Sequence, residues 1–181
     1  GSFVGAHADM LALAAAIVGN LVERGTDRMV NRNLNDGLPA FLVQNPGLND
    51  GFMMPQYTSA ALVSEIKHLA NPATSDSIPT CANQEDPVSM AYFASQKAIV
   101  SARKLQYVTA IEIYVALQAL DFLKPLHSSP ALAKVRNLIR QAVPFVEEDR
   151  YLYPDIEYIF DRVRDCTLID LVEQEIGALE F

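Results

Sequence analysis

The densest group of residues that could do chemistry is a run of two amides and two carboxylates. It consists of Asn83, Gln84, Glu85 and Asp86, at the predicted start of the longest helix. A carboxylate there could act as an acid, a base or a charge partner, and an amide could bind a polar substrate group. The same residue types also cap helix N-termini, where their side-chain oxygens accept hydrogen bonds from free backbone N–H groups. The spacing leaves both interpretations open: substrate contact by Gln84 and Glu85, or helix capping by Asn83 or Asp86.

Other common catalytic patterns do not occur in the sequence. It has no Gly-rich phosphate loop, no Gly-x-Ser-x-Gly elbow and no His-Glu-x-x-His. His7, His68 and His127 show no ligand spacing with acids or cysteines, so we predict no metal site. Cys81 and Cys166 form neither a metal nor a redox motif, and so few cysteines favour a reducing compartment.

Charge and hydropathy exclude two further classes of partner. The chain has 14 Lys plus Arg against 22 Asp plus Glu, a net charge of −8, and no basic cluster of four residues. This argues against binding to nucleic acid or to an anionic membrane. The most apolar stretch, residues 10–22, is shorter than the roughly 20 residues that span a bilayer, and the first residues lack the pattern of a secretory signal. We therefore expect no transmembrane segment and a cytoplasmic location.

Prolines and turn residues divide the chain into predicted helices, with no repeat or linker between them. The predicted helices cover residues 6–31, 55–70, 85–124, 130–143, 154–164 and 168–179. Ser128 or Ser129 can cap the fourth of these, which has Pro130 at its first position. The sequence thus predicts an all-α fold, an elongated bundle of long helices.

Helical spacing also groups apolar residues on particular faces of the first two helices. In the first helix the spaced apolar residues are Met10, Leu13, Ala14, Ile17 and Leu21. In the second helix the predicted core face consists of Tyr57, Ala61, Ser64 and His68.

The third predicted helix is unusually long and unusually apolar. It has no breaker before Pro125, so it could run for about 38 residues, or about 57 Å, whereas a compact chain of this length has a radius of gyration of about 16 Å. Between Leu105 and Leu120 it is apolar on almost every face, and such a helix must be buried. We therefore predict that partner chains pack along it. The alternative is a kinked, shorter helix within a monomer.

Four separated segments carry a family resemblance. They are Gly-Leu-Pro-Ala-Phe-Leu-Val at 37–43, Asn-Pro-Gly-Leu-Asn-Asp-Gly-Phe-Met-Met at 45–54, the stretch 72–90 with Ala-Asn-Gln-Glu-Asp, and 149–157 with Asp-Arg and Pro-Asp-Ile-Glu. In this order they resemble the histidine and aromatic amino acid ammonia-lyase family, and the resemblance covers most of the chain.

The resemblance implies an activity, a cofactor and an assembly. The family eliminates ammonia from an α-amino acid, using a 4-methylidene-imidazol-5-one (MIO) electrophile formed from an internal Ala-Ser-Gly, and works as a homotetramer with active sites shared between subunits. This chain contains no Ala-Ser-Gly. We therefore expect residues 1–181 to be the single helical C-terminal region of a larger enzyme, without its electrophile-bearing part and catalytically incomplete alone.

The resemblance also assigns roles within the polar run. Glu85 matches the catalytic-site glutamate that contacts the substrate side chain in histidine-type members, and Gln84 matches the substrate-binding amide beside it. A carboxylate can pair with an imidazole and hold its protonation state, whereas a phenyl ring offers it nothing. We therefore expect elimination of ammonia from L-histidine to give urocanate.

The sequence departs from the histidine-type pattern at one position, which leaves two alternative functions open. Histidine-type members commonly have His two residues after this glutamate, and here Pro87 stands in that place. The first alternative is a phenylalanine or tyrosine ammonia-lyase or a 2,3-aminomutase. The second alternative, prompted by the missing electrophile, is a non-catalytic helical oligomerisation module.

Overall fold

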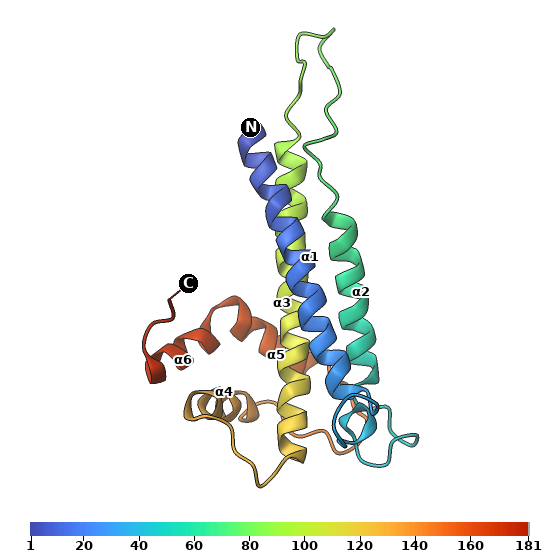
Figure 1. Cartoon of the computed structure of the whole chain (residues 1–181), viewed down its shortest axis with the longest axis vertical. Helices are drawn as coiled ribbons and strands as arrows, with labels where there is room; N and C mark the ends of the chain where they lie inside the picture. The colour runs from blue at the N-terminus through green and yellow to red at the C-terminus, as the bar shows by residue number, and fades with distance from the viewer. Residues whose placement is uncertain (181) are drawn as a thin grey trace.

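The computed structural model describes residues 1–180, and helices dominate them (Figure 1). The elements are α1 (Ser2–Val30), a 3-10 turn (Ala40–Leu42), α2 (Met53–Leu69), α3 (Ala91–Phe122), α4 (Pro130–Arg140), α5 (Tyr153–Arg164) and α6 (Thr167–Ile176). Within these described residues the only β-pairing is two isolated bridges. The predicted all-α fold is confirmed.

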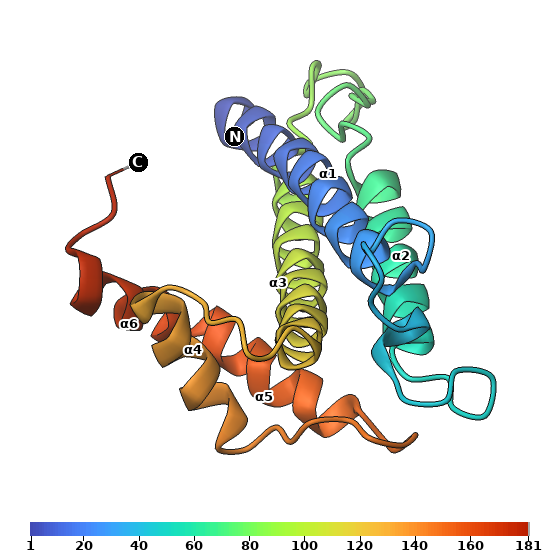
Figure 2. The ribbon, with the colours of Figure 1, turned by 60° about the horizontal axis from the view of Figure 1, so that its bottom comes forward.

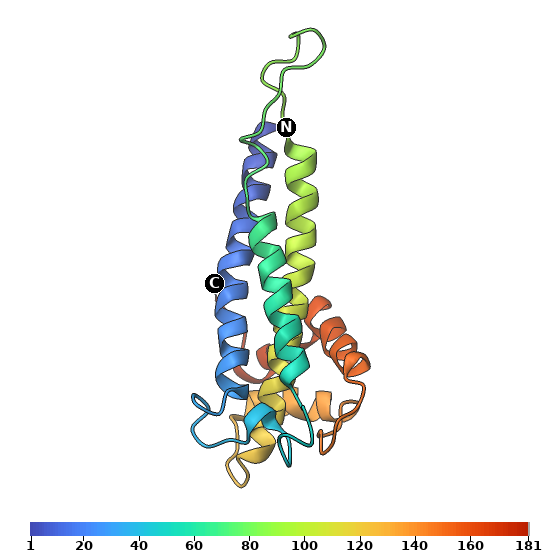
Figure 3. The same cartoon turned by 90° about the vertical axis from the view of Figure 1, so that its right-hand side faces the viewer.

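The three long helices lie side by side and form an elongated bundle (Figures 1 and 3). The other helices gather around the C-terminal half of α3, where α5 packs on α3 and α4 packs on α6. Figure 2 shows α3 between the α1–α2 pair and this group of short helices. At the opposite end the connection between α2 and α3, residues 70–90, extends beyond all three helix ends (Figure 3). We call these residues the projecting loop.

The buried face of α1 is built from small residues, not from the large apolar ones. Ala12, Ala15, Ala16 and Gly19 lie against the bundle, whereas the predicted apolar stripe faces outward, with Leu21 75% exposed. Small side chains let the axes of α1, α2 and α3 approach closely. The stripe at Met10, Leu13, Ile17 and Leu21 therefore forms an uncovered apolar surface in this chain.

The predicted core face of α2 is also wrong. The buried residues of this helix are Pro55, Ser59, Val63 and Ile66. The predicted residues Tyr57, Ala61, Ser64 and His68 are all exposed. The helix has apolar residues on both faces, so spacing alone could not decide between them.

The long helix α3 begins at Ala91, later than the predicted start at Glu85 or Asp86, and has 32 residues. Its N-cap residue, Met90, makes no capping hydrogen bond through its side chain. The predicted capping role of Asn83 or Asp86 is therefore wrong. The physical reason is that the backbone around Glu85 is paired with Thr80 in a turn and is not available to begin a helix.

The apolar part of α3 is covered within the chain. Every residue from 105 to 120 is buried or half-buried, among them Ile111, Tyr114 and Val115, which join the main core with Ile139 and Ile159. The premise that this chain cannot cover the segment is wrong, because α1, α5 and the loops pack over it. That partner chains pack along α3 stays a prediction. Exposed apolar residues on α3 lie instead in its N-terminal half.

The C-terminal predictions hold closely. Pro130 begins α4, and the Ser129 hydroxyl oxygen accepts a hydrogen bond from the Leu132 backbone N at 3.5 Å. The helix predicted over residues 154–164 is α5, and Asp155 lies in its first turn. The predicted ends of α4 and α6 were a few residues too late.

By length and composition, α1 is the one helix within residues 1–180 that could cross a membrane. The sequence prediction considered only residues 10–22, a shorter stretch than the 29-residue helix. A core helix of a soluble protein passes the same test, and α1 lies along α2 and α3 with its small residues inward. Length and composition are therefore weak support for a membrane span here.

Candidate functional site

The tip of the projecting loop is a short turn closed by backbone pairing. The Thr80 backbone N donates to the Glu85 carbonyl oxygen at 3.1 Å, and the Glu85 N donates to the Thr80 oxygen at 3.3 Å. Between them, Cys81, Ala82 and Asn83 all adopt positive φ angles. This conformation is uncommon outside glycine, so the turn holds a strained backbone at the end of a long loop.

Gln84 and Glu85 are neighbours on this tip, and both are exposed. The Thr80 hydroxyl donates to Glu85 Oε2 at 3.0 Å, which fixes one carboxylate oxygen. Within residues 1–180 no basic side chain forms an ion pair with Glu85. The other carboxylate oxygen is therefore available for an outside group.

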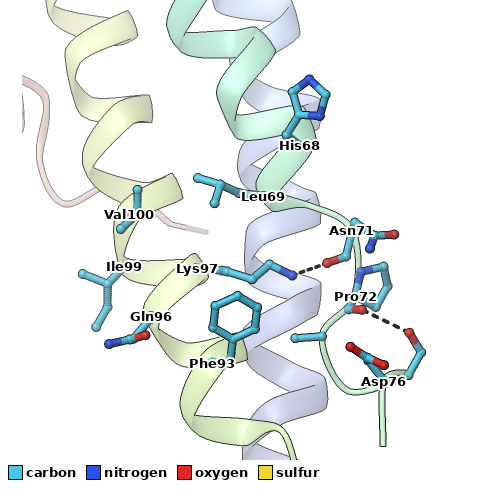
Figure 4. Close-up of a pocket in the computed structure, with 12 residues that line it drawn as sticks. His68, Leu69, Asn71, Pro72, Asp76, Phe93, Gln96, Lys97, Ile99 and Val100 are labelled. Atoms are coloured by element: carbon cyan, nitrogen blue, oxygen red, sulfur yellow. Dashed lines mark hydrogen bonds between the residues drawn. The ribbon is translucent and has the colours of Figure 1, made fainter.

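The tip lies apart from the two main cavities among residues 1–180. A cavity of about 730 Å³ lies at the base of the projecting loop, between the end of α2 and the first turns of α3 (Figure 4). A second, of about 600 Å³, lies between α2, α3 and the segment before α5. Neither includes Gln84 or Glu85. The structure thus places the two predicted site residues side by side on an exposed tip, outside both of these cavities.

A buried ion pair that the sequence analysis did not single out lies at the base of the loop. Asp9 on α1 accepts hydrogen bonds from the Ala73 N at 3.1 Å, the Thr74 N at 2.9 Å and the Thr74 hydroxyl at 2.7 Å. Lys97 on α3 places its Nζ 3.6 Å from Asp9 Oδ1 and donates to the Asn71 carbonyl oxygen (Figure 4). Burial would raise the pKa of Asp9, but the hydrogen bonds from Thr74 and Ala73 outweigh it and lower the pKa.

A sequence signal for this pair exists, although it is faint. Asp9 is the one acid among the first 22 residues, and it stands three and seven residues before Ala12 and Ala16 on the small-residue face. An acid on a buried face needs a partner. The sequence gives no means of naming Lys97 as that partner.

Two of the family-like segments meet at the other end of the molecule. Asp149 accepts hydrogen bonds from the backbone N of Asp50 at 2.8 Å and of Gly51 at 2.7 Å. Beside it, the Tyr114 hydroxyl donates to Asp155, which also pairs with Arg150. Burial, with the hydrogen bond to Asp155, raises the pKa of Tyr114. The hydrogen bonds of Asp149 and Asp155 are thus made within the chain, and they hold the segments around residues 50 and 150 in place.

Metal-binding side chains are dispersed. The part of the chain from residue 1 to residue 180 contains no group of three or more His, Cys, Asp or Glu placed to hold a metal ion.

The chain is similar in sequence to proteins of a known family. The sequence profile described as aromatic amino acid lyase matches residues 1–141. Histidine ammonia-lyase of Desulfotalea psychrophila is 50% identical over 169 residues, covering 93% of this chain and 33% of that protein.

Two solved structures share the fold over nearly the whole chain. Histidine ammonia-lyase of Trypanosoma cruzi has a TM-score of 0.92 and 41% identity, covering 96% of this chain and 34% of its own. Tyrosine aminomutase of Streptomyces globisporus has the same TM-score with 32% identity, covering 97% of this chain and 34% of its own. The chain thus spans about a third of the length of the proteins it matches. On the extent of these matches, it belongs to the aromatic amino acid lyase family.

Proposed function

We propose that this chain is the helical C-terminal portion of an ammonia-lyase that eliminates ammonia from L-histidine to give urocanate. One contrast carries the proposal: at an equal TM-score of 0.92, identity is 41% to a histidine ammonia-lyase and 32% to a tyrosine aminomutase. Because the backbones match equally well, the difference lies in side chains, which decide specificity.

In this proposal Glu85 contacts the substrate imidazole and Gln84 binds beside it. The free carboxylate oxygen of Glu85 can pair with an imidazole N–H, a charge-assisted hydrogen bond that is shorter and stronger than a neutral one. The Thr80 hydroxyl on the other oxygen orients the group. A phenyl side chain would leave the same carboxylate desolvated without a partner, which is unfavourable.

The electrophile comes from elsewhere in the proposed enzyme. The family resemblance implies an MIO group made from Ala-Ser-Gly, and none of the 181 residues forms that tripeptide. When present, the group supplies an electrophile for the substrate. The residues of this chain supply substrate contacts and no part of the group.

We propose that the site is completed by self-association, as a homotetramer. Large apolar side chains are exposed along one surface of α1 and on the first turns of α3. They are Phe3, Val4, Met10, Leu11, Leu13, Ile17, Val18 and Leu21 on α1, and Tyr92, Phe93, Ile99 and Val100 on α3. A concentration of large exposed apolar side chains is typical of an interaction site. Packing there would also bring protein around the exposed tip.

We also propose a cytoplasmic location for the enzyme. Cys81 and Cys166 are free thiols at the surface, a state that reducing compartments maintain.

The test is a substrate panel on the full-length enzyme. Purified protein is given L-histidine, L-phenylalanine or L-tyrosine, and the ultraviolet absorbance of the unsaturated acid is followed. Urocanate from histidine, with little product from the other two, is the expected result. Cinnamate or coumarate as the main product would favour the phenylalanine or tyrosine lyase, a β-amino acid would favour the aminomutase, and no product from any substrate would favour the oligomerisation module.

A further inference from the structure

Both ends of the projecting loop are held against the start of α1. A Cβ added at Gly5 would lie 2.7 Å from the Thr74 Cγ2 atom and 3.0 Å from the Ala91 Cα atom. Thr74 belongs to the segment leaving α2, and Ala91 begins α3. The beginning and the end of the loop therefore both meet α1 at Gly5. No larger residue fits there without movement.

The hydrogen bonds at this point come from one carboxylate. Asp9 lies one helical turn beyond Gly5 on α1 and accepts three hydrogen bonds from residues 73 and 74. Two of them come from backbone N–H groups, so they fix the path of the chain and not merely a side chain. The side chain of Asp9 is 6% exposed, and bonds to a buried charged acceptor are stronger than those between neutral groups.

Lys97 ties the same point to α3. Its side chain is 9% exposed and lies 3.6 Å from the Asp9 carboxylate. It also donates to the Asn71 carbonyl oxygen, just before the residues that Asp9 holds (Figure 4). One ion pair thus joins α1, the start of the loop and α3. Removing one partner of such a pair leaves the other charge buried and uncompensated.

The rest of the loop has lighter support. Two contacts join the first and second halves of the loop. The Val88 backbone N donates to the Ser77 hydroxyl oxygen at 2.8 Å, and the backbones of Thr80 and Glu85 pair with each other. These contacts stiffen the loop internally and do not attach it to the bundle. The direction in which the tip points is therefore set at the base.

We infer that the buried Asp9–Lys97 pair positions the projecting loop so that Gln84 and Glu85 reach the substrate. The catalytic consequence rests on the proposed function, whereas the effect on the loop does not. Neither Asp9 nor Lys97 touches substrate in this account, so both are positioning residues that act through Glu85.

The central variant is Asp9→Asn in the full-length enzyme. Asparagine keeps the shape of the side chain, but its NH₂ group cannot accept a hydrogen bond, and it removes the negative charge opposite Lys97. We expect kcat/KM for histidine to fall about tenfold, the loss of one charge-assisted interaction. Glu65→Gln is the matched control: it breaks the Lys104–Glu65 pair, which joins α2 to α3 with the Glu65 side chain 58% exposed, and should leave kcat/KM within about twofold.

A double-mutant cycle separates positioning from general damage. In an enzyme that already carries Glu85→Gln, Asp9→Asn should lower kcat/KM by less than about twofold, because there is no longer a carboxylate to position. An equal fall in both backgrounds would overturn the inference, because it would show that Asp9 acts independently of Glu85.

Lys97 provides a second route in case Asp9→Asn fails to fold. Lys97→Met leaves the hydrogen bonds to Asp9 but removes the opposite charge, and should lower kcat/KM about threefold or more. Lys97→Arg keeps the charge and should restore most of the activity. Equal losses in the two variants would count against the ion pair.

Hydrogen exchange tests the loop without reference to activity. Backbone amides of residues 73–90 should exchange faster in Asp9→Asn, with those of residues 105–120 unchanged. Unchanged exchange in 73–90 would overturn the inference, whatever the kinetics. If instead Glu85→Gln has no effect on histidine kinetics while the loop amides respond, the proposed role of Glu85 fails and the anchoring of the loop stands.

Discussion

The two ends of α3 differ in how far the rest of the chain buries their apolar residues. We call residues 30–52 with 105–168 the closed end, and residues 1–21 with 70–100 the open end. At the closed end Val108, Tyr114 and Val115 are fully buried by other parts of the same chain. At the open end Tyr92 is 78% exposed and Ile99 70% exposed. Apolar composition is therefore a guide to burial, but it does not say which chain provides the cover.

Two polar side chains, one from each end, show a related contrast. At the closed end the Gln118 amide is fully buried, donates to the Leu42 and Val146 carbonyl oxygens at 3.0 and 2.8 Å, and accepts from the Val146 N at 3.1 Å. At the open end Glu85 keeps a free oxygen at the surface. The Gln118 amide therefore stabilises the closed end, whereas Glu85 is the group that we propose for substrate contact.

The largest effect should come from placing a charge on the open end. Ile17→Asp puts a carboxylate on the exposed apolar surface of α1, where Ile17 is 63% exposed. We expect the full-length enzyme to lose its oligomeric state and at least about 100-fold in histidine turnover, because desolvating a charge at an interface is unfavourable. Light scattering and urocanate absorbance measure the two losses.

Leu48→Asp is the control for this variant. Leu48 is 84% exposed on a loop of the closed end, so a charge there should leave assembly intact. If Ile17→Asp leaves the oligomer unchanged, the open end is not an interface.

The next effect should appear in stability and not in assembly. Gln118→Leu removes both the donor and the acceptor at the closed end and leaves buried backbone groups unpaired. We expect the free energy of unfolding to fall by about 3 kcal/mol, measured by urea denaturation of the full-length enzyme. Gln141→Leu, at an exposed position, should have little effect. Equal midpoints for the two variants would contradict the account of the closed end.

A smaller effect should depend on pH. Burial would raise the pKa of Asp121, but hydrogen bonds from Arg136 and Lys124 and the charge of Arg140 outweigh it and lower the pKa. Because the pKa is lowered in the folded state, ionised Asp121 stabilises the fold at pH values above the ordinary carboxyl pKa, near 3.8. This stabilisation is lost as the pH falls through the lower pKa of the folded state.

Asp121→Asn should therefore lower the free energy of unfolding by about 2 kcal/mol at pH 7 and by less near pH 3. Urea midpoints at the two pH values measure this difference. A loss that stayed equal at both would show that the charge of Asp121 is not what matters.

The smallest effect should come from an exposed pair on the short helices. Lys134 and Glu175 join α4 to α6 with side chains 48% and 32% exposed. Lys134→Met should change the free energy of unfolding by less than about 0.5 kcal/mol. A loss as large as that of Asp121→Asn would show that exposure does not rank the ion pairs of this protein.

Local chemistry predicted much of the fold. Ser129 and Pro130 marked the start of α4, because capping and a fixed φ act within one turn. The buried face of α1 could not be predicted, since Ala and Gly on one side and Leu and Ile on the other are both apolar. Close approach of helices, a tertiary effect, selected the small side.

Some features of the candidate site could likewise be predicted from the sequence, and others could not. Gln84 and Glu85 could be named from local sequence and from the family resemblance. Their backbone state could not, because polar residues before a helix suit a cap as well as a turn, and here pairing with Thr80 selected the turn. The contact of Asp9 with Lys97 joins residues far apart in the chain, which no spacing rule reaches.

The most direct test of the central claim is the kinetics of Glu85→Gln in the full-length enzyme. Glutamine keeps the size of the side chain and removes its charge. We predict that kcat/KM for L-histidine falls on the order of 100-fold with the oligomeric state and melting temperature unchanged, whereas the control Glu65→Gln matches the unmodified enzyme. Unchanged histidine kinetics in Glu85→Gln would contradict the assignment of the loop tip to the substrate.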